Sequence, residues 1–258
     1  MNILIPMAGR GSRFLKEADK NPEYSRPKPL IDIAGKTMIE WSISSLPLTE
    51  QDNLIFLLLK EHVDEHQIDK ELKKIFGNSI KIIIVDQVTE GAVCTALLAK
   101  EFINNEEPLV ITDSDHFIEG KTHFEKIKKH PEADGVIPVF YATNPKWSFS
   151  KLNEDGFVEE VAEKKTISKN ANIGVYYFKK GSYFVKAAED MIKENDRVNT
   201  EFYVAPVYNY LIRKGRKILL SRPKFVYGLG TPEDVETFIG LLRSRKIEYD
   251  FKDLTLGG

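Results

Sequence analysis

Apolar positions in the first half of the chain fall into short continuous runs separated by charged, amphipathic stretches. Such runs are typical of buried strands, which we expect at 2–7, 54–59, 80–85 and 108–112. Apolar residues recurring at helical spacing predict helices at 37–46 and 61–76. Because strands and helices alternate, this half of the chain is predicted to form a parallel sheet covered on both faces.

From residue 134 onward the pattern changes to several strands in succession. Strands are predicted at 136–141, 147–152, 157–162 and 172–178, with a turn at Asn153–Gly156. These predict an antiparallel section that makes the sheet a mixed one. Helices are expected at 182–193 and 204–214, a short strand at 217–220, and a last helix with Thr231 as its N-cap and Pro232 in its first turn. With no linker apparent, we expect one α/β domain over 1–258.

Composition narrows the class of protein. The 37 basic and 39 acidic residues leave a net charge of −2, which argues against a nucleic-acid binder. The single cysteine, Cys94, excludes an intramolecular disulfide and suits a reducing compartment. No apolar run approaches the ~18 residues of a membrane span, and no signal peptide precedes the first strand. We therefore expect a cytoplasmic protein without membrane contact, and the oligomeric state, a homo-oligomer included, stays open.

The end of the first strand carries a pattern suited to phosphate binding. Gly9 and Gly11 let the backbone turn tightly and direct its N–H groups at an anion, and Arg13 adds a positive fork. Farther on, Lys28 stands between Pro27 and Pro29. Each proline fixes its own φ, and Pro29 favours an extended backbone at Lys28. A strand, an anion-binding loop and a rigidly presented lysine together indicate triphosphate chemistry.

Other interpretations of this stretch are weaker. A dinucleotide-binding fingerprint requires a third glycine where Phe14 stands. A P-loop ending at Gly35-Lys36-Thr37 would need an earlier glycine where Leu30 stands. A structural turn followed by a proline-stiffened surface loop remains as the alternative to a phosphate site, and the Pro-Lys-Pro segment disfavours it.

Two later strand ends carry further candidate residues. Gln87 follows the strand 80–85, and Gly91 opens an alanine-rich helix whose small residues would let a flat base approach the backbone. The alternative is a helix N-terminus packed closely on a strand. Asp113 and Asp115 follow the strand 108–112, where two carboxylates can share Mg²⁺ with phosphate oxygens. The alternative there is a helix cap or an Asx turn.

These motifs resemble those of the nucleoside-triphosphate transferase family, which includes the sugar-1-phosphate nucleotidyltransferases. The matching segments are Gly9–Arg13, Pro27–Leu30 and Gly35–Ile39. The resemblance implies a mostly parallel mixed sheet flanked by helices, in a Rossmann-like (GT-A-like) nucleotidyltransferase fold. It also implies Mg²⁺ dependence, release of pyrophosphate, and a nucleoside triphosphate and a small phosphate as ligands. Residues 1–133 would bind the nucleotide, 134–230 the acceptor, and 231–258 would form a C-terminal helix and tail.

The resemblance also implies residue roles, which are carried over position by position. Lys28 and Arg13 would be catalytic, and Asp115, with Asp113, would hold the metal. The nucleotide would be bound by the loop and base-side residues Ala8, Gly9, Gly11, Ser12, Gln87, Gly91 and Ala92. The acceptor would be bound by Glu163, Lys164, Asn172, Gly174 and Glu201.

One position departs from the family pattern. Sugar nucleotidyltransferases usually have a metal-binding Asp before the last helix, and Gly228 stands there in this chain. The whole pattern looks most like a short capsule-associated branch that includes CTP:phosphoglutamine cytidylyltransferase. We therefore expect transfer from CTP to a small phosphorylated acceptor. A sugar-1-phosphate uridylyl- or thymidylyltransferase is the alternative enzyme, and a non-catalytic nucleotide-binding regulator is the alternative of another class.

Overall fold

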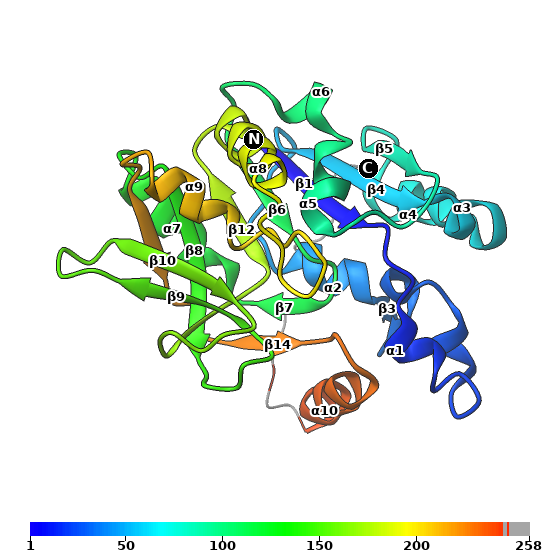
Figure 1. The fold of residues 1–258 in the computed structure, drawn as a ribbon. Helices are drawn as coiled ribbons and strands as arrows, with labels where there is room; N and C mark the ends of the chain where they lie inside the picture. Colours follow the sequence, from blue (N-terminus) through cyan, green and yellow to red (C-terminus); the bar gives the residue numbers. More distant parts are fainter. Residues whose placement is uncertain (245–246, 248–258) are drawn as a thin grey trace.

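A ten-stranded sheet runs through the whole molecule (Figure 1). The computed structural model describes residues 1–244 and 247. The strand order is β10-β9-β11-β8-β12-β6-β1-β4-β5, and β13 pairs with β8. These strands are β1 (Asn2–Met7), β4 (Asn53–Leu59), β5 (Lys81–Val85), β6 (Leu109–Thr112), β8 (Gly135–Tyr141), β9 (Ser148–Leu152), β10 (Val158–Glu163), β11 (Asn170–Asn172), β12 (Val175–Phe178) and β13 (Ile218–Ser221). Two small sheets pair β2 (Asp32–Ile33) with β3 (Lys36–Thr37) and β7 (His116–Ile118) with β14 (Val226–Gly228).

Helices lie on both faces of the large sheet (Figure 1). They are α1 (Ser12–Leu15), α2 (Met38–Ser44), α3 (Lys60–His66), α4 (Ile68–Phe76), α5 (Ala92–Leu97), α6 (Lys100–Ile103), α7 (Gly120–Lys129), α8 (Gly181–Lys193), α9 (Val207–Ile212) and α10 (Pro232–Arg243). Two short 3-10 turns are η1 (Pro22–Ser25) and η2 (Lys28–Leu30). Among the described helices none is long and apolar enough to cross a bilayer.

The predicted change from a parallel to an antiparallel section of the sheet is confirmed. Strands β6, β1, β4 and β5 are parallel neighbours, whereas β12 runs antiparallel between β6 and β8. The continuous apolar runs arise because the central strands bury both faces. In β1, Leu4 packs into the core on one side, and Ile3 and Ile5 pack into the core on the other. The carboxyl ends of parallel strands meet at one edge, so the loops after β1, β5 and β6 open at the same edge of the sheet.

Two predicted elements are interrupted. The helix predicted at 61–76 is two helices, α3 and α4, because Gln67 between them has a left-handed backbone with φ of +50°. The strand predicted at 172–178 is two strands, β11 and β12, separated by Ile173 and Gly174. The last helix begins as expected, with the Thr231 hydroxyl accepting a hydrogen bond from the Asp234 N–H at 3.2 Å. The predicted tail lies outside the described residues except at Ile247.

Candidate active site

The loop after β1 holds two segments close together. Gly11 has φ of +65°, a conformation that glycine adopts without strain. A Cβ at this position would lie 2.9 Å from the Cβ of Lys28. Gly11 therefore provides both the turn that starts α1 and the space in which the lysine segment approaches the glycine-rich loop.

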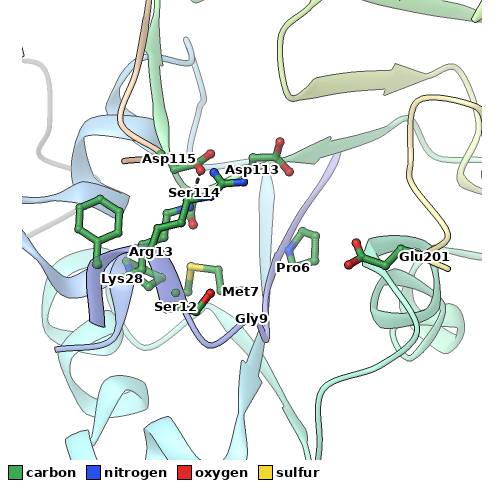
Figure 2. Close-up of a pocket in the computed structure, with 14 residues that line it drawn as sticks. Pro6, Met7, Gly9, Ser12, Arg13, Lys28, Asp113, Ser114, Asp115 and Glu201 are labelled. Carbon is green, nitrogen blue, oxygen red and sulfur yellow. Dashed lines mark hydrogen bonds and ion pairs between the residues drawn. The ribbon is translucent and has the colours of Figure 1, made fainter. Parts of the chain in front are cut away.

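Lys28 is presented by a tight turn. The expected extended backbone is wrong, because Lys28 begins η2, where Leu30 donates to the Pro27 carbonyl at 2.8 Å and Ile31 to the Lys28 carbonyl at 3.2 Å. Pro27 and Pro29 still flank the lysine and restrict the chain. The Lys28 ammonium forms an ion pair with the Asp115 carboxylate (Figure 2).

Asp113 and Asp115 lie in a loop that three parts of the chain hold in place. The Asp113 N–H donates to the Gly174 carbonyl at 2.8 Å, and the Ser42 hydroxyl donates to the Asp113 carbonyl at 2.9 Å. The Leu229 N–H donates to the Asp115 carbonyl at 2.7 Å. The next element is the strand β7, so the two carboxylates do not cap a helix.

A cavity of about 450 Å³ brings the glycine-rich loop, the lysine and the carboxylate pair together (Figure 2). Its lining consists of Pro6, Met7, Gly9, Gly11, Ser12, Arg13, Phe14, Lys28, Pro29, Asp113, Ser114, Asp115, Glu201 and Gly230. Figure 2 shows Glu201 across the loop from Lys28 and Arg13. Ala8 is not part of this lining and is buried.

The two aspartates differ in their electrostatics. Burial raises the pKa of Asp113 to about 7, and the neighbouring Asp115 carboxylate adds to the rise. Burial disfavours the charged form of Asp115 too, but the Lys28 ammonium outweighs it, so the pKa of Asp115 lies below its usual value. Burial lowers the pKa of the adjacent His116 to about 4, so this imidazole is neutral at pH 7.

The carboxylate pair fits a hard divalent cation. Mg²⁺ prefers oxygen ligands and is commonly held by one or two carboxylates together with substrate phosphates. Asp113 and Asp115 offer such oxygens in the cavity, and a cation there would relieve the repulsion from Asp115 that adds to the effect of burial on the pKa of Asp113. Within the described chain no cluster of three or more potential protein ligands is present, so phosphate oxygens or water would have to complete the coordination.

The predicted base-side residues lie apart from this cavity. Gln87 is exposed in the loop after β5, and neither it nor Gly91 or Ala92 lines the cavity. Gly91 has φ of +130°, and a Cβ there would lie 2.5 Å from the Phe202 carbonyl oxygen. The N-terminus of α5 is therefore packed closely on a neighbouring segment. This packing places the base-side loop against Phe202, the residue that follows Glu201.

The predicted acceptor residues are spread over several elements. Glu201 lines the cavity, and Gly174 packs against Asp113, since a Cβ at Gly174 would lie 1.9 Å from Asp113 Oδ2. Burial raises the pKa of Glu163 to about 7. The Lys164 ammonium donates to the Tyr203 hydroxyl and lies 4.5 Å from the centroid of its ring.

Asn172 is buried at the end of β11. Its Oδ1 accepts a hydrogen bond from the Ser150 hydroxyl at 2.7 Å, while its Nδ2 has no hydrogen-bond partner in the described part of the chain. A buried amide donor without a partner is costly, so this group marks a place where a ligand oxygen or a water would be favourable.

Sequence reasoning missed a second cavity of about 450 Å³. Its lining has Arg13, Asp113, Asp115 and Gly230 in common with the first cavity, and it also includes Gly174, which packs against Asp113. Its further lining consists of His116, Phe140, Lys146, Trp147, Ile173, Val226, Gly228, Thr231 and Asp234. The sequence signal that could have located part of it is the Asn144–Trp147 turn between two predicted strands of the acceptor section.

The model of the nucleotidyl transferase family matches residues 23–218, which include Lys28, Asp113, Asp115 and most of the acceptor section. The chain belongs to this nucleotidyl transferase family. The match extends over well more than half of the 258 residues, and it confirms the family to which the phosphate-binding motifs pointed.

Relatives and solved structures agree with this assignment. The bifunctional protein GlmU of Limosilactobacillus reuteri is 26% identical over 223 residues, which are 81% of this chain and 44% of the relative. The chain thus spans about half the length of the curated relatives it matches. The nucleoside-diphosphate-sugar pyrophosphorylase of Vibrio cholerae has a TM-score of 0.80 at 26% identity, with 92% of this chain and 99% of that one covered.

A more distant structure shares the fold. The inositol-1-phosphate CTP transferase of T. maritima has a TM-score of 0.71 at 13% identity, with 96% of this chain and 97% of that one covered. At this identity the likeness concerns the fold alone. Together the solved structures confirm the predicted nucleotidyltransferase fold, a mixed sheet flanked by helices.

Proposed function

We propose that the protein transfers a nucleoside monophosphate from a nucleoside triphosphate to a small phosphate ester and releases pyrophosphate. The observation that supports this most is the single cavity in which Arg13, Lys28 and Asp115 meet the glycine-rich loop. These groups come from distant parts of the sequence, and each is suited to a phosphate or to the cation that accompanies it. Sugar phosphates are the first acceptor class to test, in keeping with the Vibrio cholerae pyrophosphorylase.

In the proposed reaction, a phosphate oxygen of the acceptor attacks the α-phosphorus, and pyrophosphate leaves in line. Because a phosphate oxygen is already nucleophilic, catalysis is mainly positioning and charge neutralisation. The N–H groups of the loop from Gly9 to Ser12 and the Arg13 guanidinium would hold the β- and γ-phosphates. The Lys28 ammonium would leave Asp115 to contact the α-phosphate and the attacking oxygen. Mg²⁺, bound by Asp115 and Asp113, would supply further neutralisation of phosphate charge.

Several residues would set the identity of the two substrates. Gln87, with Gly91 and Ala92 beside it, would read the base. On the acceptor side, the unpartnered Asn172 Nδ2 and the cavity-lining Glu201 offer a donor and an acceptor to the second substrate. Glu163, Lys164 and Gly174 would complete this side.

Among the nucleoside triphosphates, we favour CTP as the substrate. The capsule-associated resemblance supports a role in modifying capsule or surface polysaccharide, with conversion of L-glutamine phosphate to CDP-L-glutamine as the specific form of this hypothesis. The fold likeness to the inositol-1-phosphate CTP transferase is compatible with CTP. The alternative enzyme is a sugar-1-phosphate uridylyl- or thymidylyltransferase, which the Vibrio cholerae pyrophosphorylase favours.

The test is a pyrophosphate-release assay with Mg²⁺ and each of CTP, UTP, dTTP, ATP and GTP. Each nucleotide is combined with a panel of sugar 1-phosphates and phosphorylated amino acids. Release with CTP and a non-sugar phosphate supports the capsule-associated form of the proposal. Release with UTP or dTTP and a hexose 1-phosphate supports the sugar enzyme instead. Tight nucleotide binding by calorimetry without release across the panel would replace both with a nucleotide-binding regulator.

A further inference from the structure

The second cavity is connected to the proposed reaction centre through shared walls. Arg13, Asp113, Asp115 and Gly230 line both cavities. A ligand whose phosphate lies beside Asp115 and Lys28 could therefore extend its organic part into the second cavity. Its volume of about 450 Å³ lies within the usual size range of small-molecule sites, which is roughly 300 to 1,000 Å³.

One wall of the second cavity is aromatic. Phe140 and Trp147 meet edge to face with ring centroids 5.2 Å apart. The Lys146 ammonium lies 4.8 Å from the centroid of the Trp147 ring, so one cation of the chain already occupies this aromatic surface. Ile173 and Val226 extend the apolar lining. Such walls suit the carbon skeleton of a ligand.

The same cavity also carries a carboxylate, that of Asp234. Asp234 Oδ2 would lie 3.8 Å from a Cβ placed on Gly228, so the absence of a side chain at Gly228 leaves open space in front of this carboxylate. The backbone N–H of Asp234 bonds to Thr231, but the carboxylate has no hydrogen bond or ion pair within the described residues. A carboxylate accepts hydrogen bonds only, so its complement is a donor on the ligand.

A metal-binding role fits Asp234 less well. The described residues contain no group of three or more side chains arranged to hold a metal ion, so Asp234 does not join Asp113 and Asp115 in one cluster. It shares a cavity with them, which places it beside the path of a ligand instead.

We propose that the second cavity binds the organic part of the acceptor and that Asp234 selects acceptors carrying a hydrogen-bond donor, a hydroxyl or an ammonium. Trp147 contacts the carbon skeleton next to that donor. This inference rests on the proposed function, because the acceptor phosphate must lie at Lys28 and Asp115. It adds Asp234 and Trp147 to the acceptor residues implied by the family resemblance, and it gives Gly228 a role as the position that opens the space.

Three phosphate esters of equal length test this selection. They are 2-hydroxyethyl phosphate, 2-aminoethyl phosphate and propyl phosphate, which differ only in the terminal group. Binding is measured by calorimetry with Mg²⁺ and an α,β-methylene nucleoside triphosphate present, so that no turnover is needed. We expect the wild-type protein to bind at least one of the two donor-bearing esters about tenfold or more tightly than propyl phosphate. Equal binding of all three esters, or binding of none, would overturn the proposal.

Substitutions at position 234 identify the donor. Asp234→Ala should remove the preference for donor-bearing esters. Asp234→Asn should retain most of the preference if the donor is a hydroxyl and lose about tenfold or more if it is an ammonium, because the charge attraction disappears. Glu233→Gln is the matched control, because it removes one acidic charge from the same first turn at an exposed position outside the cavity. It should bind like the wild type.

Turnover kinetics distinguish a failure of this inference from a failure of the proposed function. With an active acceptor, Asp234→Asn should raise the acceptor KM while kcat at saturating acceptor and the Mg²⁺ dependence stay unchanged. A lower kcat with a changed Mg²⁺ dependence would show a metal-binding role and overturn the inference. If the esters are discriminated through Asp234 but no nucleotide is transferred to any acceptor, then the proposed function fails and the binding assignment stands.

Discussion

The two sides of the candidate site are built in different ways. On the phosphate side, Arg13, Lys28 and Asp115 converge in one cavity, and an ion pair joins two of them. On the acceptor side, the residues implied by the family are dispersed. Glu201 lines the same cavity, Lys164 is bonded to Tyr203, and Asn172 is buried against Ser150.

In the proposed reaction, this difference separates the part of the site that all substrates would share from the part that would distinguish them. A triphosphate is the same for every base, so the groups that hold it need one arrangement. An acceptor differs from enzyme to enzyme, and the walls that we propose for it here come from several strands and loops, including the turn before β9 and the start of α10. Changes on the phosphate side should therefore lower kcat, and changes on the acceptor side should alter KM for one substrate.

The largest effect is expected from Asp115→Asn. This change removes the charge that pairs with Lys28 and one of the two carboxylates proposed for Mg²⁺, so it should abolish Mg²⁺-dependent turnover. Pyrophosphate release is measured against Mg²⁺ concentration, with Asp64→Asn, an exposed aspartate that does not line the cavity, as the control. Activity that returns fully at higher Mg²⁺ would show that the cation is held elsewhere.

Lys28→Ala should lower kcat by about a hundredfold or more, as expected for the loss of one preorganised donor to a transition-state oxygen. KM for the acceptor should change far less. Steady-state kinetics give both values, and circular dichroism verifies the fold. A folded variant with near-normal turnover would remove Lys28 from the catalytic residues and leave the phosphate side without its central cation.

Gly174→Ala tests the contact between a predicted acceptor residue and Asp113, which lies on the phosphate side. A Cβ there would lie 1.9 Å from Asp113 Oδ2 and 2.7 Å from Asp113 Cγ, so the carboxylate must move. We expect kcat/KM to fall by about ten- to a hundredfold, or about 1.4 to 2.8 kcal/mol. Gly240→Ala, where a Cβ would meet nothing within 4 Å, is the matched control. Equal activity of the two variants would show that the position of Asp113 is unimportant.

The smallest effect concerns Glu163 and pH. Burial raises the pKa of Glu163 to about 7, so this group is ionised above pH 7 and protonated below it. If the carboxylate accepts hydrogen bonds from the acceptor, KM for the acceptor should rise by about tenfold between pH 8 and pH 6. Glu163→Gln should flatten that profile, which steady-state kinetics at several pH values would measure.

The same group gives a stability test with a defined sign. Because the folded pKa of Glu163 lies above its unfolded value, its contribution to stability is present below the unfolded pKa and is lost as pH rises through 7. Glu163→Gln should therefore raise the unfolding midpoint in urea more at pH 8 than at pH 5. An equal change at both pH values would contradict the raised pKa.

The sequence predicted the framework well and singled out residues that the structure brings together in one cavity, for local reasons. The buried strands were evident as apolar runs, and the start of α10 followed from Thr231 and Pro232. Gly11 and Lys28 could be singled out because glycine and proline restrict the backbone in known ways. The turn at Lys28 was predicted as extended, because hydrogen bonds from Leu30 and Ile31 to the preceding carbonyls decide it.

Long-range packing explains most of what the sequence did not reveal. The break between β11 and β12 occurs where Gly174 meets Asp113, two residues that are distant in the chain. The second cavity needs Trp147, Gly228 and Asp234 from three separate segments. No local pattern brings these three residues together, so the second cavity as a whole is visible only in the folded chain.

The central claim is that the α-phosphate of the nucleotide reaches the acceptor at Lys28. It is tested most directly by incubating the wild-type protein with the acceptor and the active nucleoside triphosphate, labelled with ³²P at either the α- or the γ-position. We predict that the α-label moves to the acceptor and the γ-label appears in pyrophosphate, and that both transfers slow by about a hundredfold or more in Lys28→Ala. Appearance of the γ-label on the acceptor or in inorganic phosphate alone would contradict nucleotidyl transfer.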